Sequence, residues 1–231
     1  MGEELTMDQH ISIAIDGPAA AGKSTVAKRV AKALGFTYID TGAMYRAVTY
    51  AVIKAGKNPT KVEDAESILP SLQIELKEDG SIFCNNEDVT QIIRTPMISG
   101  NVSYIAAMKP VRLALIKMQR KMAEHQCVVM DGRDIGSYVL PHAQVKIFQL
   151  ASAEIRAQRR YLEDQEKGIP ATYEEVLAEV KKRDYIDSHR DFDPLMAAED
   201  AVKLDTSQMN VEEVVQAILA IVKEKTGLEA K

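Results

Sequence analysis

Eight consecutive residues near the start of the chain have the types and spacing of a phosphate-binding loop. Residues 17–24 read GPAAAGKS, which matches the pattern G-x-x-x-x-G-K-[ST] in full. A glycine-rich backbone lets successive N–H groups and a helix N-terminus face an anion. In such loops the lysine reaches the β- and γ-phosphates, and the final hydroxyl binds Mg²⁺. The sequence therefore predicts an ATP or GTP site with Lys23 and Ser24 as ligands; the alternative is a glycine turn beside a chance Lys-Ser pair. The predicted donor site comprises Gly17, Pro18, Ala19, Ala20, Ala21, Gly22, Lys23, Ser24 and Thr25.

A second group of anion-binding side chains lies in residues 40–46, DTGAMYR. Thr41 stands where it could cap a predicted helix, and Arg46 falls near the first turn of that helix. The phosphate of an acceptor molecule would fit between this helix N-terminus and the guanidinium. A capped helix with a solvated arginine explains the same residues, so the motif alone leaves both interpretations open.

The tetrapeptide 131–134, DGRD, follows a predicted buried strand. Asp131 ends that strand, where a Walker-B-type carboxylate would order Mg²⁺ through water or hold Lys23. Arg133 could bridge the donor and acceptor phosphates. A plain Asp-Gly turn is the alternative, but ligands of open α/β sheets collect at the carboxyl ends of strands, which favours a functional role.

Two arginine-containing stripes follow later in the chain. Arg156, Arg159 and Arg160 have i, i+3, i+4 spacing and are expected on one helix face, which predicts a short lid over about 156–171. A solvated face is the alternative, because acidic residues lie nearby. The second stripe, in residues 183–190, contains Arg183, Asp187 and Arg190; it suits a sugar-phosphate acceptor or a surface salt-bridge ladder, and the residues leave this undecided.

The elements that position these groups alternate between strands and helices. Strands are predicted at 11–15, 36–39, 127–130, 145–150 and 201–204. Helices are predicted at 23–34, 43–55, 97–108, 111–126, 153–167, 173–187 and 211–226. A hairpin around 73–84, followed by a possible strand at 89–94, interrupts this alternation as an insert over about 68–96. The pattern predicts an α/β fold with a doubly wound, mostly parallel sheet and a small antiparallel β insert.

Composition limits the possible classes of protein. The 231 residues include 29 Lys and Arg against 34 Asp and Glu, a net charge of −5 that disfavours a nucleic-acid binder. No apolar run has the length of a membrane span. Cys84 and Cys127 form no CxxC pair, and we expect two reduced thiols in a cytoplasmic protein. Residues 1–9 are expected to be a flexible extension, and residues 10–231 a single domain.

The rest of the sequence narrows the kind of P-loop protein. A guanine-reading [NT]-K-x-D motif after a later strand is missing, which disfavours a GTPase switch. A small-molecule kinase needs an acceptor pocket, positive charge over the transferred phosphoryl group and a lid, and the sequence supplies candidates for each. Kinases for shikimate or another nucleotide, and a nucleotide-dependent switch without chemistry, remain the alternatives.

Five segments together resemble bacterial cytidylate kinase, and the resemblance covers nearly the whole chain after residue 9. They are residues 15–24, 34–35, 40–46, 131–136 (DGRDIG) and 182–184 (KRD). The resemblance implies a P-loop fold with five parallel strands and an acceptor-binding β insert. It also implies MgATP-dependent phosphorylation of CMP or dCMP by a monomer. Ser24 and Thr41 stand where relatives carry Gly and Ser, and both substitutions keep or add a hydroxyl.

The resemblance also assigns roles to particular residues. It implies cytosine contacts by Ser103, Arg112 and Asp134, ribose contacts by Arg183 and Asp187, acceptor-phosphate contacts by Arg46, Arg133 and Arg190, and lid positions for Arg159 and Arg160. Thr41, beside Arg46, is expected among the substrate-binding residues. Arginine, aspartate and serine complement the amino, ring-nitrogen and carbonyl groups of cytosine, whereas uracil would leave buried polar groups unpaired. Catalysis would then consist of positioning and charge neutralisation by Lys23, Arg133, the lid arginines and Mg²⁺.

Overall fold

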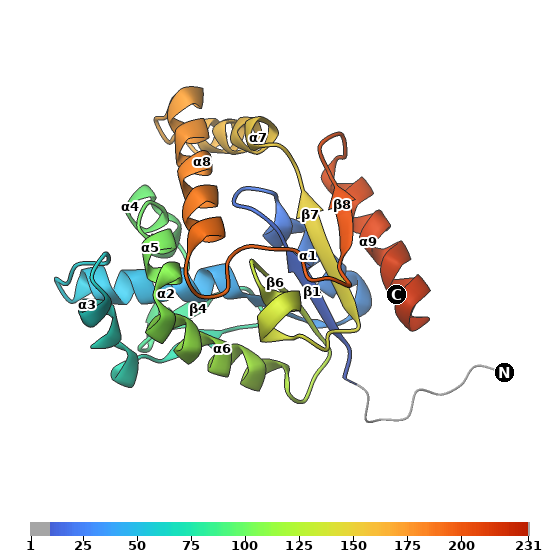
Figure 1. Cartoon of the computed structure of the whole chain (residues 1–231), viewed down its shortest axis with the longest axis horizontal. Coiled ribbons are helices and arrows are strands. Elements are labelled where there is room, and N and C mark those ends of the chain that lie inside the picture. The colour runs from blue at the N-terminus through green and yellow to red at the C-terminus, as the bar shows by residue number, and fades with distance from the viewer. Residues whose placement is uncertain (1–9, 231) are drawn as a thin grey trace.

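A parallel five-stranded sheet forms the centre of the protein (Figure 1). The computed structural model describes residues 10–230, so the predicted extension 1–9 lies outside the described residues. The sheet has the order β2-β6-β1-β7-β8, and every neighbouring pair is parallel. Its strands are β1 (Ser12–Asp16), β2 (Thr37–Asp40), β6 (Val128–Gly132), β7 (Val145–Leu150) and β8 (Val202–Asp205). The predicted α/β class and parallel sheet are confirmed.

Helices cover both faces of the sheet because side chains alternate along each strand. Ile13 and Ile15 pack into one core together with side chains of α1 (Lys23–Leu34) and α9 (Val211–Thr226). Ala14, between them, joins the opposite core with α2 (Thr41–Lys54), α5 (Val102–Ala107) and α6 (Lys109–Ala123). The remaining helices are α3 (Val62–Glu66), α4 (Pro96–Ser99), α7 (Ala153–Glu166) and α8 (Tyr173–His189). None of the helices in residues 10–230 is long and apolar enough to span a membrane.

A three-stranded antiparallel sheet confirms the predicted β insert. It consists of β3 (Ile74–Leu76), β4 (Ile82–Cys84) and β5 (Glu87–Asp88), in the order β3-β4-β5. The expected strand at 89–94 is wrong, because the pairing ends at Asp88. The carboxylate of Asp88 accepts the backbone N–H of Thr90 at 2.9 Å and turns the chain, and a short 3₁₀ helix follows at Ile92–Arg94.

The helix expected at 97–108 is broken into α4 and α5. Gly100 ends α4, and the side chain of Asn101 donates to the carbonyl of Met97 at 2.9 Å in place of a continued backbone ladder. The break places Ser99 at the end of one short helix and Ser103 at the start of the next. Both serines consequently face the same cleft.

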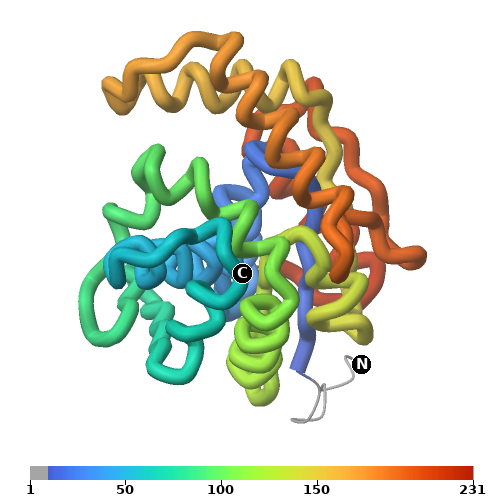
Figure 2. The backbone as a smooth tube through the Cα atoms, turned by 60° about the vertical axis from the view of Figure 1, so that its left-hand side comes forward, coloured from blue at the N-terminus to red at the C-terminus, as the bar shows by residue number. Residues whose placement is uncertain are grey.

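Helices α7 and α8 form an antiparallel hairpin above the carboxyl edge of the sheet (Figure 1). Figure 2 shows this hairpin extending over the segment that contains α4, with an open space between the two backbones. Both helices begin with side-chain caps: Ser152 caps α7, and Thr172 with Glu175 forms a capping box at the start of α8. The hairpin occupies the predicted lid segment.

Candidate active site

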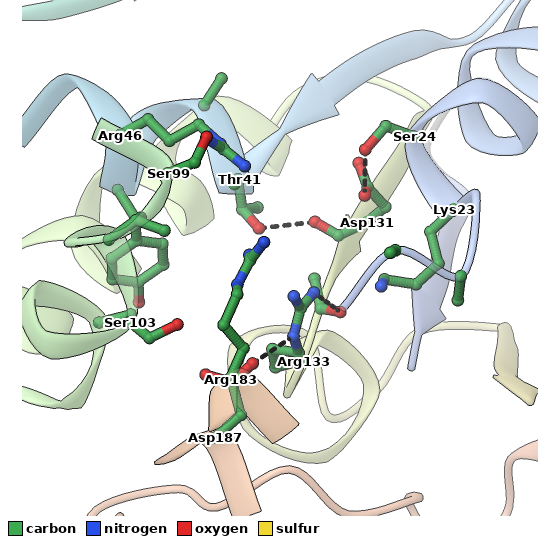
Figure 3. A pocket seen from close by; sticks show the side chains of 18 of the residues that line it. Lys23, Ser24, Thr41, Arg46, Ser99, Ser103, Asp131, Arg133, Arg183 and Asp187 are labelled. Atoms are coloured by element: carbon green, nitrogen blue, oxygen red, sulfur yellow. Dashed lines mark hydrogen bonds and ion pairs between the residues drawn. The ribbon is translucent and has the colours of Figure 1, made fainter. Parts of the chain in front are cut away.

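One cleft of about 340 Å³ lies at the carboxyl ends of β1, β2 and β6, between the phosphate loop, α2, α5 and α8. All but three of the predicted site residues line it. The exceptions, Gly17, Pro18 and Ala19, form the first part of the phosphate loop. Residues that are far apart in the sequence therefore share one cavity, as Figure 3 shows for ten of them.

The phosphate loop depends on its two glycines. Gly17 has φ +150°, and a Cβ there would lie 2.3 Å from the carbonyl oxygen of Gln149; Gly22 has φ +81°. Lys23 is only 5% exposed, and its Nζ donates to the carbonyl of Pro18 at 2.7 Å. Burial and the nearby Arg133 hold the pKa of Lys23 well below its usual range. A bound phosphate would supply the negative charge that this buried ammonium group lacks.

Asp131 occupies the predicted position beside the phosphate loop. Its Oδ2 accepts from the hydroxyl of Ser24 at 2.9 Å, and its Oδ1 accepts from the hydroxyl of Tyr38 at 2.8 Å. Burial, and then Asp40, raise the pKa of Asp131 to about 6. Sequence reasoning missed Tyr38. The sequence indicated only that a tyrosine hydroxyl lies on β2, the strand that pairs with the one containing Asp131.

The predicted capping role of Thr41 is wrong. Asp40 caps α2 instead, because its Oδ1 accepts the backbone N–H of Ala43 at 2.8 Å. The hydroxyl of Thr41 donates across the sheet to the carbonyl of Asp131 at 2.6 Å. Gly132 permits this approach, since a Cβ at that position would lie 2.9 Å from the Thr41 oxygen. Thr41 thus ties α2 to the end of β6.

Three arginines from different elements converge in the middle of the cleft (Figure 3). Arg46 donates to the hydroxyl of Ser99 at 2.6 Å, and Arg133 donates through Nε to the carboxylate of Asp187 at 2.8 Å. Arg183 extends from α8 between them. Its buried Nε has no hydrogen-bond partner among residues 10–230.

The three guanidinium groups repel one another. Burial and the charge of Arg183 lower the pKa of Arg46 to about 9. Burial, followed by Arg133, also lowers the pKa of Arg183. Burial lowers the pKa of Arg133 too, but the carboxylates of Asp187, Asp131 and Asp184 together outweigh it, so the pKa of Arg133 is raised. A cluster of mostly uncompensated cations requires an anion, and guanidinium groups bind phosphate in bidentate fashion.

A buried ion pair closes the far end of the cleft. Arg112 is fully buried and donates through Nη2 to Asp134, and its Nη1 donates to the hydroxyl of Tyr45 at 3.2 Å. Ser103 lines the same part of the cavity and is 5% exposed. Arg190 lies beside this pair, with Nη2 3.7 Å from Asp134. Sequence reasoning missed Tyr45, which comes from the second turn of α2.

The predicted lid arginines have separate contacts. Arg159 donates to the carbonyls of Thr206 and Met209 at 2.7 and 3.3 Å. Arg160 pairs with Asp164 one turn later, at 3.0 Å. Both line the cleft, whereas Arg156, expected on the same face, is buried at the base of the hairpin. The i, i+3, i+4 spacing therefore did not predict a common orientation.

Asp16, the residue before the phosphate loop, was also missed. Its two carboxylate oxygens accept the backbone N–H groups of Ile135 and Gly136 at 2.8 and 2.7 Å. Burial raises the pKa of Asp16 to about 7, although these hydrogen bonds oppose the change. Asp16 therefore fixes the turn that follows Arg133 and Asp134.

The donor atoms near the phosphate loop suit magnesium. Residues 10–230 contain no group of three or more His, Cys, Asp or Glu side chains placed to hold a metal ion. Ser24 and Asp131 offer a hydroxyl and a carboxylate oxygen within 2.9 Å of each other. Mg²⁺ prefers oxygen ligands and usually completes its shell with water and substrate phosphates. The pair therefore fits a site that a nucleotide completes.

Sequence comparisons match the whole domain. A family model described as Cytidylate kinase matches residues 13–224. A protein named cytidylate kinase from Anoxybacillus flavithermus is 51% identical over 222 residues, covering 95% of this chain and 99% of the relative. A protein of the same name from Bacillus cytotoxicus is 50% identical over 221 residues, covering 94% of this chain and 98% of the relative. Another from Bacillus cereus is 49% identical over 228 residues, covering 97% of this chain and 100% of the relative.

Solved structures similar to this chain are more distant in sequence. A crystal structure of an uncharacterized protein from Eubacterium ventriosum has a TM-score of 0.50 and 14% identity, covering 94% of this chain and 99% of that one. A gluconokinase from Sinorhizobium meliloti has a TM-score of 0.46 and 15% identity, with 94% of both chains covered. At this level of identity, the first likeness concerns the fold alone.

Proposed function

Because the chain belongs to the cytidylate kinase family, we propose that it transfers the γ-phosphoryl group of ATP to CMP and dCMP. The products are ADP with CDP or dCDP, which places the enzyme in pyrimidine nucleotide metabolism. One observation carries this proposal: the phosphate loop, the arginine cluster and the buried Arg112–Asp134 pair line a single cleft. These three regions match the donor phosphates, the acceptor phosphate and the acceptor base.

The phosphate loop is the proposed donor site. Its backbone N–H groups and the N-terminus of α1 would face the phosphates of ATP, with Lys23 directed at the terminal ones. Lys23 would exchange its bond to the Pro18 carbonyl for a phosphate oxygen, and its lowered pKa would then return toward its usual value. The proposed donor residues remain those of the loop from Gly17 to Thr25.

The arginine cluster is the proposed acceptor-phosphate site. Arg46 would hold the phosphate of the nucleoside monophosphate, and Arg133 would lie between it and the donor. Arg183, which the family resemblance assigns to the ribose, extends between these two arginines and would also lie near that phosphate. Arg190 lies beside Asp134, at the proposed base site, and its contact with the acceptor phosphate rests on the family resemblance alone. Thr41 keeps α2 against β6, so that Arg46 reaches the cluster from a fixed helix. Asp187 holds Arg133 and would also reach the ribose hydroxyls.

The Arg112–Asp134 pair is the proposed base site. Arg112 supplies N–H donors to a carbonyl or ring nitrogen, and Asp134 accepts from an exocyclic amino group. Ser103, on α5, faces the same region. Uracil has a carbonyl where cytosine has its amino group, so it would set an acceptor against the Asp134 carboxylate.

Charge neutralisation and positioning are the proposed source of catalysis. The attacking oxygen of the acceptor phosphate is already anionic, so no general base is required. Mg²⁺, held by Ser24 and by Asp131 through water, would neutralise charge on the donor phosphates. Arg133, Lys23 and the lid residues Arg159 and Arg160 would stabilise the charge that develops during transfer.

Two segments are proposed to enclose the nucleotides. The insert, residues 68–96, would bind the acceptor, and the lid, residues 156–171, would close over the phosphates and limit hydrolysis of ATP by water. We also propose, from the family resemblance, a monomer that acts on free nucleotides; the net charge of −5 disfavours nucleic acid as the substrate. Cys84 and Cys127 are free thiols, which supports a cytoplasmic location.

An acceptor panel tests this function. ADP release from ATP is measured with CMP, dCMP, UMP, AMP and shikimate as acceptors. We expect CMP and dCMP to give the highest kcat/KM. A preference for AMP or shikimate would favour another P-loop small-molecule kinase, and tight nucleotide binding without acceptor-dependent ADP release would favour a switch.

A further inference from the structure

A partly buried ion pair joins helices α7 and α8 to the phosphate loop; the side chain of Arg156 is 5% exposed and that of Asp184 is 25% exposed. Arg156, in the first turn of α7, is 4% exposed, and its Nη2 lies 2.6 Å from Oδ2 of Asp184 in α8. Its Nη1 lies 3.1 Å from Oδ1 of the same carboxylate, so the pair is bidentate. The Nε group donates to the carbonyl of Ala151 at 2.9 Å and fixes the guanidinium where β7 leads into α7.

The same two side chains hold both backbone polar groups of Ala19. Arg156 Nη1 donates to the Ala19 carbonyl at 2.7 Å, and the Ala19 N–H donates to Asp184 Oδ1 at 3.3 Å. Ala19 is fully buried, and the next residue, Ala20, has φ +57°, a left-handed conformation that residues with a side chain seldom adopt. The bend of the loop at Ala20 therefore follows a residue, Ala19, whose N–H and carbonyl groups are both held by hydrogen bonds.

We propose that Arg156 and Asp184 are positioning residues, which set the conformation of the phosphate loop for ATP and fasten the base of the lid to it. This inference rests on the proposed binding of ATP by that loop. Neither side chain lines the cleft, so neither contacts substrate in this arrangement. Their effect must pass through the Ala19 backbone. A displacement of a few tenths of an ångström there would misdirect the N–H groups that follow it in the loop.

The neighbouring contacts between α7 and α8 provide a matched control. Glu154 and Lys181 also join the two helices, at 3.2 Å, but both side chains are 57% exposed and neither is bonded to the phosphate loop. An exposed pair of this kind adds little to stability. Removing it tests whether any ion pair between the lid helices produces the effect.

The experiment compares Arg156→Ala, Asp184→Ala, the double variant and Glu154→Ala in steady-state kinetics with ATP and CMP. We expect KM for ATP to rise on the order of tenfold in Arg156→Ala and in Asp184→Ala, with KM for CMP within about twofold of the wild-type value. The KM for ATP of the double variant should be no higher than that of either single variant, because each single substitution already removes the same contact. Asp184→Asn keeps an acceptor for the Ala19 N–H, so its KM for ATP should lie between the values of Asp184→Ala and the wild type.

Specific outcomes separate the possibilities. Unchanged KM for ATP, equal rises for both substrates, additive effects in the double variant, or the same rise in Glu154→Ala would each overturn the proposal. Thermal melting identifies a variant that fails to fold, in which case Asp184→Asn supplies the kinetic test. A wild-type protein that does not phosphorylate CMP would contradict the proposed function instead. In that event, calorimetric binding of ATP to the same variants still tests the positioning role.

Discussion

Arg112 and Asp134 form an ion pair in which the two side chains are only 1% and 6% exposed, although both line an open cleft. The pair joins α6 to the segment after β6, and Tyr45 from α2 adds a hydrogen bond to it. A buried pair of charges is costly to desolvate, and its retention is explained when the charged groups also recognise a ligand. We assign it to recognition of the acceptor base.

Asp134→Asn should lower the preference for CMP over UMP. The amide can turn either a donor or an acceptor toward the base, so we expect the ratio of the two kcat/KM values to fall by about one to two orders of magnitude. The measurement is that ratio in the variant and the wild type. Lys117→Ala, an exposed position on the same helix as Arg112, is the control. An unchanged ratio in Asp134→Asn would remove this residue from base recognition.

Arg133→Ala should reduce kcat while leaving the fold intact. Within the arginine cluster, Arg133 lies on the side of the phosphate loop. In the proposed reaction negative charge would move past this guanidinium, and losing such a group costs about 10²–10³ in kcat. Single-turnover kinetics at saturating ATP and CMP measure the loss, and circular dichroism checks the fold. Arg29→Ala, an exposed arginine on α1, controls for a change in net charge. Wild-type turnover in Arg133→Ala would contradict its assigned role.

Asp131→Asn should raise the concentration of Mg²⁺ needed for half-maximal activity. The carboxylate accepts from Ser24 and Tyr38, so an amide would both weaken the metal site and change the orientation of the Ser24 hydroxyl. A titration of activity with MgCl₂ at fixed ATP measures the shift, which we expect to be on the order of tenfold. Tyr38→Phe removes one of the two contacts and should give a smaller shift. Identical titration curves for the wild type and Asp131→Asn would place the metal elsewhere.

Asp16 should make stability depend on pH. Burial raises the pKa of Asp16 from 3.8 to about 7, so between these values the folded state binds the proton more tightly than the unfolded chain. The contribution to the free energy of unfolding is present below pH 4 and is lost as pH rises toward 7, with a slope of at most ~1.4 kcal/mol per pH unit.

Urea unfolding of Asp16→Asn and the wild type from pH 4 to 8 measures this contribution. The difference in free energy of unfolding between the two proteins should change with pH up to about 7 and then level off. Asp79→Asn is the control, because Asp79 is exposed and its pKa is lowered by hydrogen bonds from Ser81. A difference that stays constant over the whole range would show that Asp16 keeps the same charge in both states.

Local patterns in the sequence predicted the parts of the site that lie within one short segment. The phosphate loop is such a part, because the spacing of Gly17, Gly22 and Lys23 within eight residues is enough to recognise it as an anion-binding turn. The five strands of the large sheet and their parallel direction were also predicted, because strands alternate with helices along the chain. Arg133 and Asp131 were predicted from their place at the end of a buried strand, since parallel strands present their carboxyl ends at one edge.

Contacts between distant segments were not predictable in this way. Tyr38 reaches Asp131 only because β2 and β6 pair in one register, and Asp16 reaches Gly136 across a neighbouring strand. Thr41 looked like a helix cap because its type and position fit one, but the carbonyl at the end of β6 competes for the same hydroxyl. These contacts depend on how distant strands align in the folded sheet, and the spacing of residues within one segment does not predict that alignment.

The most direct test of the account follows the transferred phosphate itself. The wild-type enzyme is given ATP labelled in the γ-phosphate together with CMP and MgCl₂, and the products are separated. We predict that the label appears in CDP, in an amount equal to the ADP formed, and that little label is released as inorganic phosphate. Label that remains in ATP, or that goes to inorganic phosphate irrespective of CMP, would contradict it.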